Sequence, residues 1–208
     1  LSWFVPQIYH RGNCLILGLR VLCHGCPSSD RPVLFVSNHT SYLDIVVLAA
    51  QLKATFVAKQ EVAEWPGFGL LARLNRTVFV QRNARRSREY RDEMHRRLAA
   101  GHSLILFPEG TSNDGNRVLD FNSTFFSVAE NRVLTDPTTV QPVAIAYTRL
   151  NGLPVGRSRR PLFAWYGDMG LVGHLWSVLG QSTVTIEIAF LPPVTIETCG
   201  SRKEMARH

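Results

Sequence analysis

Long apolar runs are what this 208-residue sequence most clearly lacks. Its first 23 residues are rich in apolar side chains, but a proline, a histidine and two arginines interrupt them (Pro6, His10, Arg11 and Arg20). No window reaches the roughly 18 to 20 uninterrupted apolar residues that a membrane-spanning helix needs. We therefore predict no spanning helix in this sequence.

The same N-terminal segment has two interpretations. Trp3, Phe4 and Tyr9 lie near arginines, which is typical of an amphipathic helix in the membrane interface. The alternative is a helix that packs against the folded domain. We predict a membrane-associated segment with such an interfacial helix over residues 1–30, followed by one folded domain over residues 31–208.

Cysteine is scarce, and its spacing excludes familiar cofactor sites. The pair Cys23–Cys26 has no second C-x-x-C partner, so the spacing does not indicate a zinc site. Pro27 follows where haem attachment requires histidine. We expect Cys14, Cys23, Cys26 and Cys199 to be reduced thiols in a protein that faces the cytosol. No metal site is predicted.

Acidic residues are outnumbered by basic ones, 16 to 23, which gives a formal net charge of +7. Nearly all of the basic residues are arginines. Excess positive charge favours an anionic partner, such as nucleic acid, an anionic membrane surface or a phosphorylated substrate. Nucleic acid is the least favoured of these, because basic and aromatic residues do not interleave along the sequence.

Short β-branched and aromatic runs alternate with helical patterns along the chain. Strands are predicted at 32–38, 54–59, 78–81, 103–110, 139–148 and 182–191. Helices are predicted at 42–51, with Ser41 as N-cap, and at 84–100, where arginines form a solvated face or contact lipid headgroups. Residues 150–161 are the most loop-like. This alternation predicts a single α/β domain with a mixed, mostly parallel sheet flanked by helices.

A histidine and an aspartate stand between two apolar segments, in the stretch SNHTSYLD. On one continuous helix, residues five apart point about 140° away from each other. If His39 ends a strand and Asp44 lies in the first helical turn, the two side chains can form a hydrogen bond. A carboxylate on one imidazole nitrogen makes the other a better base. A core histidine and a metal ligand are the alternatives at this point.

No nucleophile for that base is evident in the sequence. The hydrolase motif G-x-S-x-G is absent, and its nearest approach, residues 110–114, ends in Asp114. A base without a protein nucleophile indicates that it activates a hydroxyl of the substrate.

Two further motifs follow predicted strands. In Phe107-Pro108-Glu109-Gly110, proline restrains the backbone and glycine permits close approach of a ligand, so Glu109 would be presented in a defined direction. The alternative is a tight turn with an exposed glutamate. Arg82 lies just past another strand, where its guanidinium could bind a phosphate in a bidentate manner.

Taken together, these motifs resemble the glycerophospholipid acyltransferase family. Four blocks occur in the family's order, at residues 38–44 (NHTSYLD), 56–82 (FVAKQEVAEWPGFGLLARLNRTVFVQR), 107–111 (FPEGT) and 140–147 (VQPVAIAY). The resemblance extends from about residue 30 to residue 192 and makes residues 31–208 an acyltransferase domain.

The resemblance implies roles for the two residues of the first block. His39 would be the general base that deprotonates the acceptor hydroxyl, and Asp44 would orient it. The alcohol then attacks an acyl thioester directly, with acyl-CoA or acyl carrier protein as donor and no metal or other cofactor. Backbone N–H groups at the start of the helix after Ser41 are candidates for stabilising the thioester oxyanion.

The other blocks would bind substrate. The resemblance assigns Arg82 to the acceptor phosphate, and Glu109 and Gly110, with Thr111 beside them, to the glycerol phosphate. Pro142 is placed near the acyl or acceptor pocket.

Two departures from the family pattern bear on the acceptor. Gln81 stands where the second block often has aspartate, and Ser112-Asn113 stand where arginine often follows the threonine. The first expectation is an O-acyltransferase that converts 1-acylglycerol-3-phosphate to phosphatidic acid. A lyso-ornithine lipid or another lysolipid is the alternative acceptor.

The expected partners are a lysophospholipid, an acyl thioester and an anionic membrane surface, without nucleic acid. The expected location is the cytoplasmic face of the cell membrane, as a peripheral or monotopic protein in phospholipid biosynthesis. A thioester hydrolase that uses the same pair on water, and a basic lipid- or nucleic-acid-binding module, are rivals from other classes.

Overall fold

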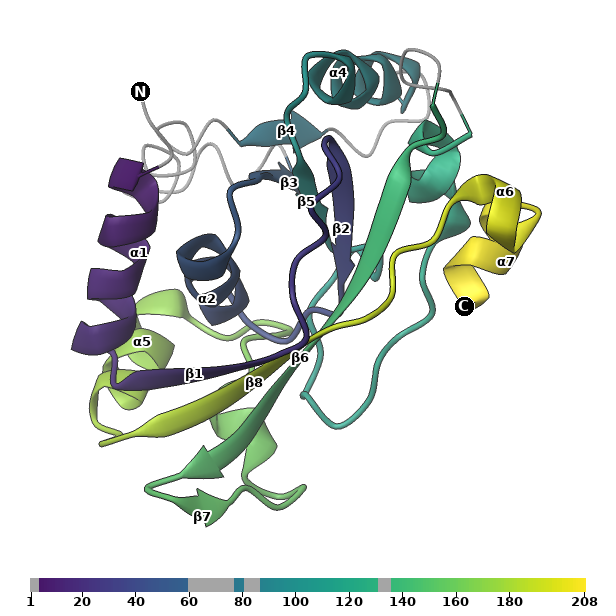
Figure 1. Cartoon of the computed structure of the whole chain (residues 1–208). Coiled ribbons are helices and arrows are strands. Elements are labelled where there is room, and N and C mark those ends of the chain that lie inside the picture. Colours follow the sequence, from purple (N-terminus) through teal and green to yellow (C-terminus); the bar gives the residue numbers. More distant parts are fainter. Residues whose placement is uncertain (1–3, 60–76, 81–86, 131–135) are drawn as a thin grey trace.

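The computed structural model describes residues 4–59, 77–80, 87–130 and 136–208. Within these ranges the strands form a sheet in the order β1-β8-β6-β2-β5-β3-β4, with β7 paired to β6 (Figure 1). The strands are β1 (Leu19–His24), β2 (Val33–Ser37), β3 (Thr55–Lys59), β4 (Val78–Val80), β5 (Leu104–Leu106), β6 (Thr139–Leu150), β7 (Leu153–Pro154) and β8 (Val184–Phe190).

The sheet is mixed and mostly parallel, which confirms the predicted fold class. Strand β2 pairs in parallel with β5 and β6, and β3 pairs in parallel with β4 and β5. Strand β8 pairs in parallel with β1 and antiparallel with β6. The register sets Val36 of β2 opposite both Leu106 of β5 and Pro142 of β6. The chain segments that follow β2 and β5 therefore begin at one edge of the sheet, where sites in α/β folds are built.

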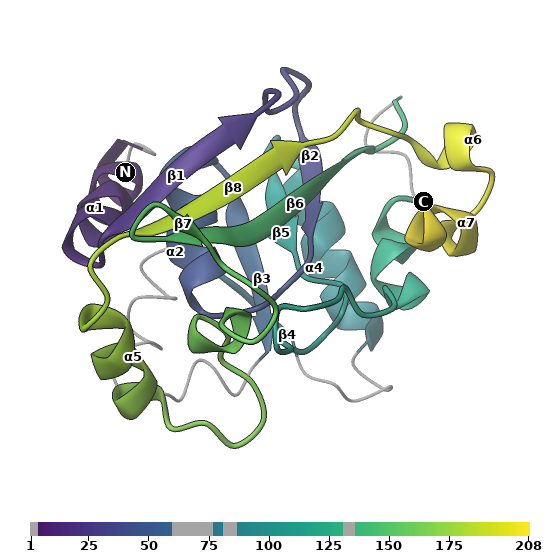
Figure 2. The ribbon, with the colours of Figure 1, turned by 90° about the horizontal axis from the view of Figure 1, so that it is seen from below.

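Helices cover both faces of the sheet (Figures 1 and 2). They are α1 (Phe4–Ile16), α2 (Leu43–Gln51), α4 (Ser87–Ala99), α5 (Leu171–Leu179), α6 (Ile196–Cys199) and α7 (Arg202–Arg207), with 3-10 turns η3 (Ser123–Val128) and η4 (Arg160–Leu162). One buried cluster joins α1, α2 and α5 to the sheet, and a second joins α4, η3 and α7 to its other face.

Strand β2 shows why the sheet is covered on both sides. Val33 and Phe35 belong to the cluster under α2, while Leu34 and Val36 belong to the cluster under α4. Successive side chains of a strand point to opposite faces, so a continuous apolar run has to be covered twice. All five residues of β2 are buried.

Most predicted elements are confirmed, with different ends. Strand β5 stops at Leu106 instead of extending through the predicted range 103–110, because Pro108 and Gly110 form a turn. Helix α2 begins at Leu43 with Tyr42 as its N-cap, so the assignment of Ser41 as N-cap was wrong by one residue. The loop-like segment 150–161 contains β7, which forms a short antiparallel pair with β6.

The N-terminal segment contains a strand that the sequence analysis missed. Strand β1 is paired along its whole length with β8, so the predicted boundary at residue 30 separates a strand from its own sheet. Its edge position explains the weak signal, since only Leu19 of β1 is fully buried. Helix α1 packs on α2, and Arg11 Nε donates a hydrogen bond to the Ala50 carbonyl.

The packing of α1 on α2 matches the alternative interpretation of the N-terminal segment, a helix that packs against the folded domain. Membrane association of this segment stays a prediction. Over the described ranges, no helix combines the length and the apolar character that crossing a bilayer requires.

Candidate active site

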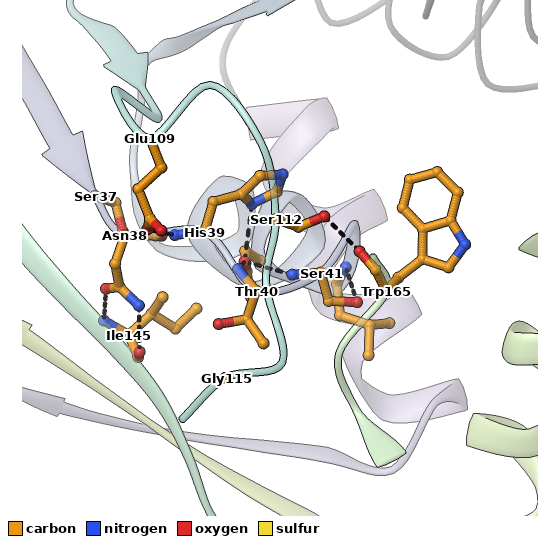
Figure 3. Close-up of polar contacts among 12 residues, drawn as sticks. Ser37, Asn38, His39, Thr40, Ser41, Glu109, Ser112, Gly115, Ile145 and Trp165 are labelled. Atoms are coloured by element: carbon orange, nitrogen blue, oxygen red, sulfur yellow. Dashed lines mark hydrogen bonds and ion pairs between the residues drawn. The ribbon is translucent and has the colours of Figure 1, made fainter. Parts of the chain in front are cut away.

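Asn38 directly follows β2 and leads the chain toward the site. The last β2–β6 pair is Ser37 with Val143. Beyond it, the Asn38 side chain takes the place of a strand backbone: Nδ2 donates to the Ile145 carbonyl at 3.0 Å, and the Ile145 N–H donates to Oδ1 at 2.8 Å (Figure 3). The main chain is thereby released from the sheet while it stays attached to β6. The next residue, His39, leaves the strand.

His39 and Asp44 meet as the sequence predicted. His39 Nδ1 lies 3.0 Å from Asp44 Oδ2, because His39 follows β2 and Asp44 lies in the first turn of α2. The Asp44 side chain is fully buried, whereas the His39 side chain is 20% exposed. Nδ1 is occupied by the carboxylate, so Nε2 is the ring nitrogen left for a ligand.

The buried Asp44 carboxylate is fully surrounded by donors, as a charge removed from water must be. Oδ2 also accepts hydrogen bonds from the N–H groups of Thr40 and Ser41, at 2.7 and 2.9 Å. The Tyr147 hydroxyl donates to Oδ1 at 2.7 Å. Burial, and then the negative charge of Asp44, raise the pKa of Tyr147 well above its usual value, so Tyr147 stays a donor.

These contacts occupy several of the N–H groups around the start of α2, where the candidate donors to the oxyanion lie. The N–H groups of Thr40 and Ser41 are used to hold Asp44. Those of Asp44 and Ile45 donate to the carbonyls of Ser41 and Tyr42. The N–H groups of Asp44 and Ile45 are therefore already bonded within the first turn of α2.

An aromatic stack fixes the orientation of the His39 ring. The Phe107 ring lies 4.1 Å from it, centroid to centroid, at an angle of 20°. Phe107 in turn stacks on Phe56 of β3. The imidazole is therefore held by a carboxylate at one edge and by a ring on one face.

Glu109 holds the backbone of the same turn. Oε1 accepts the His39 N–H at 2.7 Å, and Oε2 accepts the Leu119 N–H at 2.9 Å and Asn113 Nδ2 at 2.8 Å. Burial raises the pKa of Glu109, and these three hydrogen bonds act against that shift. Glu109 is half-buried, so it is not the exposed glutamate in a tight turn that the sequence left as the alternative. Its observed contacts are with the protein itself.

The turn that carries Glu109 explains the glycine after it. The Gly110 N–H donates to the Phe107 carbonyl at 3.1 Å, and Gly110 adopts a φ of +67°. Residues with a Cβ rarely adopt this backbone conformation. The neighbouring Thr111 is exposed, and its hydroxyl donates to the Ser112 carbonyl, so the structure does not bring it into the His39–Glu109 network.

Pro142 lines a groove beside this network. The groove has a volume of about 900 Å³ and lies between β6, the segment after Glu109 and α7. Its lining is mostly apolar and includes Asn38, Leu119, Phe121, Pro142, Ala144 and Met205. The groove thus extends from the residue before His39 along β6, and its volume is within the range of ligand pockets in proteins.

The remaining predicted residues are placed as follows. Arg82 lies outside the described residues. Gln81, the first departure from the family pattern, also lies outside them. Both residues of the second departure have partners: Ser112 donates its hydroxyl to the Trp165 carbonyl, and Asn113 donates to Glu109. In the part of the chain that the structure describes, no serine, threonine or cysteine hydrogen-bonds to the His39 ring.

Metal binding finds no support in the same residues. No cluster of three or more histidine, cysteine or carboxylate side chains suited to a metal ion occurs within the described ranges. Cys14, Cys23, Cys26 and Cys199 are all free thiols.

Two contributors to this site were missed in the sequence. Tyr147 lies 103 residues after Asp44, and Asn113 was noted only as a departure. A tyrosine at a buried position of an apolar strand was the available signal, because a buried hydroxyl needs a partner.

Comparison with known proteins places these features in context. Residues 20–146 match the family described as Acyltransferase. The lyso-ornithine lipid O-acyltransferase of Rhizobium meliloti (strain 1021) is 45% identical, over 98% of this chain and 71% of its own length. The 1-acyl-sn-glycerol-3-phosphate acyltransferase of Neisseria gonorrhoeae is 33% identical, over 85% of this chain and 66% of its own.

A solved structure has the same fold. The 1-acyl-sn-glycerophosphate acyltransferase PlsC of Thermotoga maritima superimposes with a TM-score of 0.66 and 20% identity, covering 99% of this chain and 73% of that one. At this identity the likeness concerns the fold alone.

Proposed function

The chain belongs to the acyltransferase family and is an O-acyltransferase with a lysolipid acceptor, and from this premise we propose that His39 and Asp44 are its general-base dyad and a lyso-ornithine lipid its preferred acceptor. The observation that carries the proposal is the Nδ1–Oδ2 contact of 3.0 Å, which leaves Nε2 outside that contact on a side chain that is 20% exposed. The acyl group comes from acyl-CoA or acyl carrier protein.

The reaction follows from that geometry. Nε2 of His39 takes the proton of the acceptor hydroxyl as its oxygen attacks the thioester carbonyl carbon. Asp44 stabilises the imidazolium that forms. The tetrahedral intermediate collapses, the carbon–sulfur bond breaks, and the proton on Nε2 passes to the leaving thiolate. The products are an ester and a free thiol, without an acyl-enzyme.

Glu109 acts in this scheme by positioning. Its carboxylate holds the His39 N–H on one oxygen and the Leu119 N–H on the other, so it ties the dyad to the wall of the groove. We propose that a substrate hydrocarbon chain lies in this groove, beside Pro142 and Ala144. A groove with a largely apolar lining suits such a chain.

The choice of acceptor rests on Ser112 and on the relatives. Where the family often has a cationic arginine, this chain has Ser112, whose hydroxyl donates a hydrogen bond to the Trp165 carbonyl. A lyso-ornithine lipid offers an amino-acid headgroup instead of a phosphate, and the relative at 45% identity bears that name. Lysophosphatidic acid is the second candidate, favoured by the relative at 33% identity.

A competition assay tests the acceptor. With one acyl-CoA and equal amounts of lyso-ornithine lipid and lysophosphatidic acid, we expect ornithine lipid to form about tenfold faster than phosphatidic acid, since a phosphate that lacks one of its cationic partners is bound less well. Both products are measured by mass spectrometry.

Two variants of one position provide the control. Ser112→Arg adds the absent cation and should shift the product ratio toward phosphatidic acid. Ser112→Ala removes the same hydrogen bond to Trp165 without adding charge, and should leave the ratio unchanged. Faster formation of phosphatidic acid by the unmodified protein would reject the lyso-ornithine lipid as preferred acceptor.

We further propose that the protein works at an anionic membrane surface, on its cytoplasmic side, as a peripheral or monotopic protein. The net charge of +7 supports this, because anionic lipids attract basic proteins. The exposed apolar side chains of α1, which include Ile8, Leu15 and Ile16, support it as well.

A further inference from the structure

Helix α5 carries an outward apolar stripe that the proposed reaction does not use. None of its nine residues is charged. Val172, Trp176 and Leu179 are exposed, the first two at 82% and 78%. Their spacing of four and three residues places them along one side of the helix. Leu171 and Leu175 of the same helix are partly buried and pack against the core.

The stripe is unusual in its composition. An exposed tryptophan between two exposed aliphatic side chains would order water unless something covers it. Tryptophan prefers the boundary between hydrocarbon and water, where its ring is buried and its N–H stays hydrated. An uncharged helix with this outer face is typical of a segment that lies in a lipid interface.

Charge and location agree with a lipid surface. Arg157 and Arg159 are exposed in the segment that leads to α5, and Asp168 is the acidic residue between them and the helix. Helices α1 and α5 lie at the same end of the molecule in both ribbon views (Figures 1 and 2). Two helices with exposed apolar side chains thus lie at one end of the molecule, and two exposed arginines precede one of them in the chain.

Helix α5 is also attached directly to the active-site turn. His174 Nδ1 lies 3.1 Å from the Tyr42 hydroxyl, and the two rings pack edge to face. The backbone N–H of Trp165, a residue in the segment that leads to α5, donates to the Thr40 carbonyl at 3.0 Å. Thr40 and Tyr42 lie between His39 and Asp44 in the chain, so a surface bound by α5 would lie in a defined relation to the dyad.

We propose that α5 is a bilayer-docking helix, which lays Val172, Trp176 and Leu179 into an anionic lipid surface and sets the active-site turn against that surface. The proposal rests on the proposed function in one respect: a lysolipid acceptor reaches His39 from a bilayer. It goes beyond that function because it assigns docking to α5 and not only to the N-terminal segment.

Vesicle binding tests the proposal without any reaction. The full-length protein is sedimented with vesicles of phosphatidylcholine and phosphatidylglycerol. Replacing Val172, Trp176 and Leu179 with serine should weaken partition at least about tenfold, because each buried apolar side chain contributes appreciably to binding. Leu153→Ser is the matched control: Leu153 is 67% exposed but lies in β7, so its replacement should leave partition unchanged.

A kinetic readout separates docking from catalysis. With acceptor presented in vesicles, the triple variant should show a raised KM. With acceptor dispersed in detergent micelles, its kcat should equal that of the unmodified protein, because none of the three residues touches the dyad.

Three results would overturn the proposal. One is unchanged vesicle partition of the triple variant, and another is equal weakening by Leu153→Ser. The third is a dimer that becomes a monomer in the triple variant, which would make a second copy of the chain the occupant of α5. If the unmodified protein acylates no lysolipid, the proposed function fails, and vesicle partition still decides the role of α5.

Discussion

Replacing His39 with alanine is expected to lower kcat for ester formation by about 10²–10⁴-fold, the usual contribution of a positioned general base. The acceptor hydroxyl would lose the nitrogen that takes its proton, while the groove beside Pro142 and the Glu109 network would stay. Thiol release from acyl-CoA should fall by the same factor as ester formation, and KM for the acceptor should change little. Both products are followed in one time course.

The chain offers a matched control for this experiment. His24 also pairs with a carboxylate, at 3.0 Å from Glu187, but it lies on the edge strand β1 and its side chain is 59% exposed. His24→Ala removes a similar contact far from α2, so its activity should stay within about twofold of the unmodified protein. A His39→Ala variant that keeps its ester-forming rate would remove His39 from the mechanism.

The second large effect is expected for Asp44→Asn. The amide has the same shape, but its NH₂ replaces one of the two oxygens. It must then face groups that donate to Asp44, either the Tyr147 hydroxyl at the Oδ1 position or the Thr40 N–H and His39 at the Oδ2 position. The imidazolium also loses its counter-charge. We expect kcat to fall about 10²–10⁴-fold, and the free energy of unfolding to fall by about 1–3 kcal/mol, the cost of buried polar groups left unsatisfied. Steady-state kinetics and urea denaturation measure the two effects.

Tyr147→Phe separates stability from catalysis in this second experiment. It removes one donor to Asp44 and leaves the carboxylate with its charge and its contacts to His39 and the turn. Stability should fall, but kcat should fall far less than in Asp44→Asn. If the two variants lose kcat equally, the role of Asp44 is to hold the turn, and its charge does not contribute to the reaction.

The sequence predicted the centre of the site better than its surroundings. The contact between His39 and Asp44 followed from one assumption, that the chain changes from strand to helix between them, and the structure confirms it. Their roles in the reaction stay predictions. The Glu109 side chain was expected to point in a defined direction, and the hydrogen bond that it accepts from the His39 N–H holds it in one.

The partners of these residues could not be read from the sequence, for a physical reason. Tyr147 reaches Asp44 because β6 lies beside β2 in one register, and Asn113 reaches Glu109 because a loop folds back. Hydrophobic periodicity predicts strands and helices but not which strands pair. Strand β1 was missed for a related reason, since an edge strand buries too few residues to show a pattern.

The most direct test of the account compares the ester formed with the thiol released when the protein is given acyl-CoA, with and without lyso-ornithine lipid. The account predicts equal amounts of ester and thiol when the acceptor is present, and little thiol without it, because the acceptor hydroxyl is the attacking group. Thiol release that is equally fast without acceptor, with free fatty acid as the product, would contradict it.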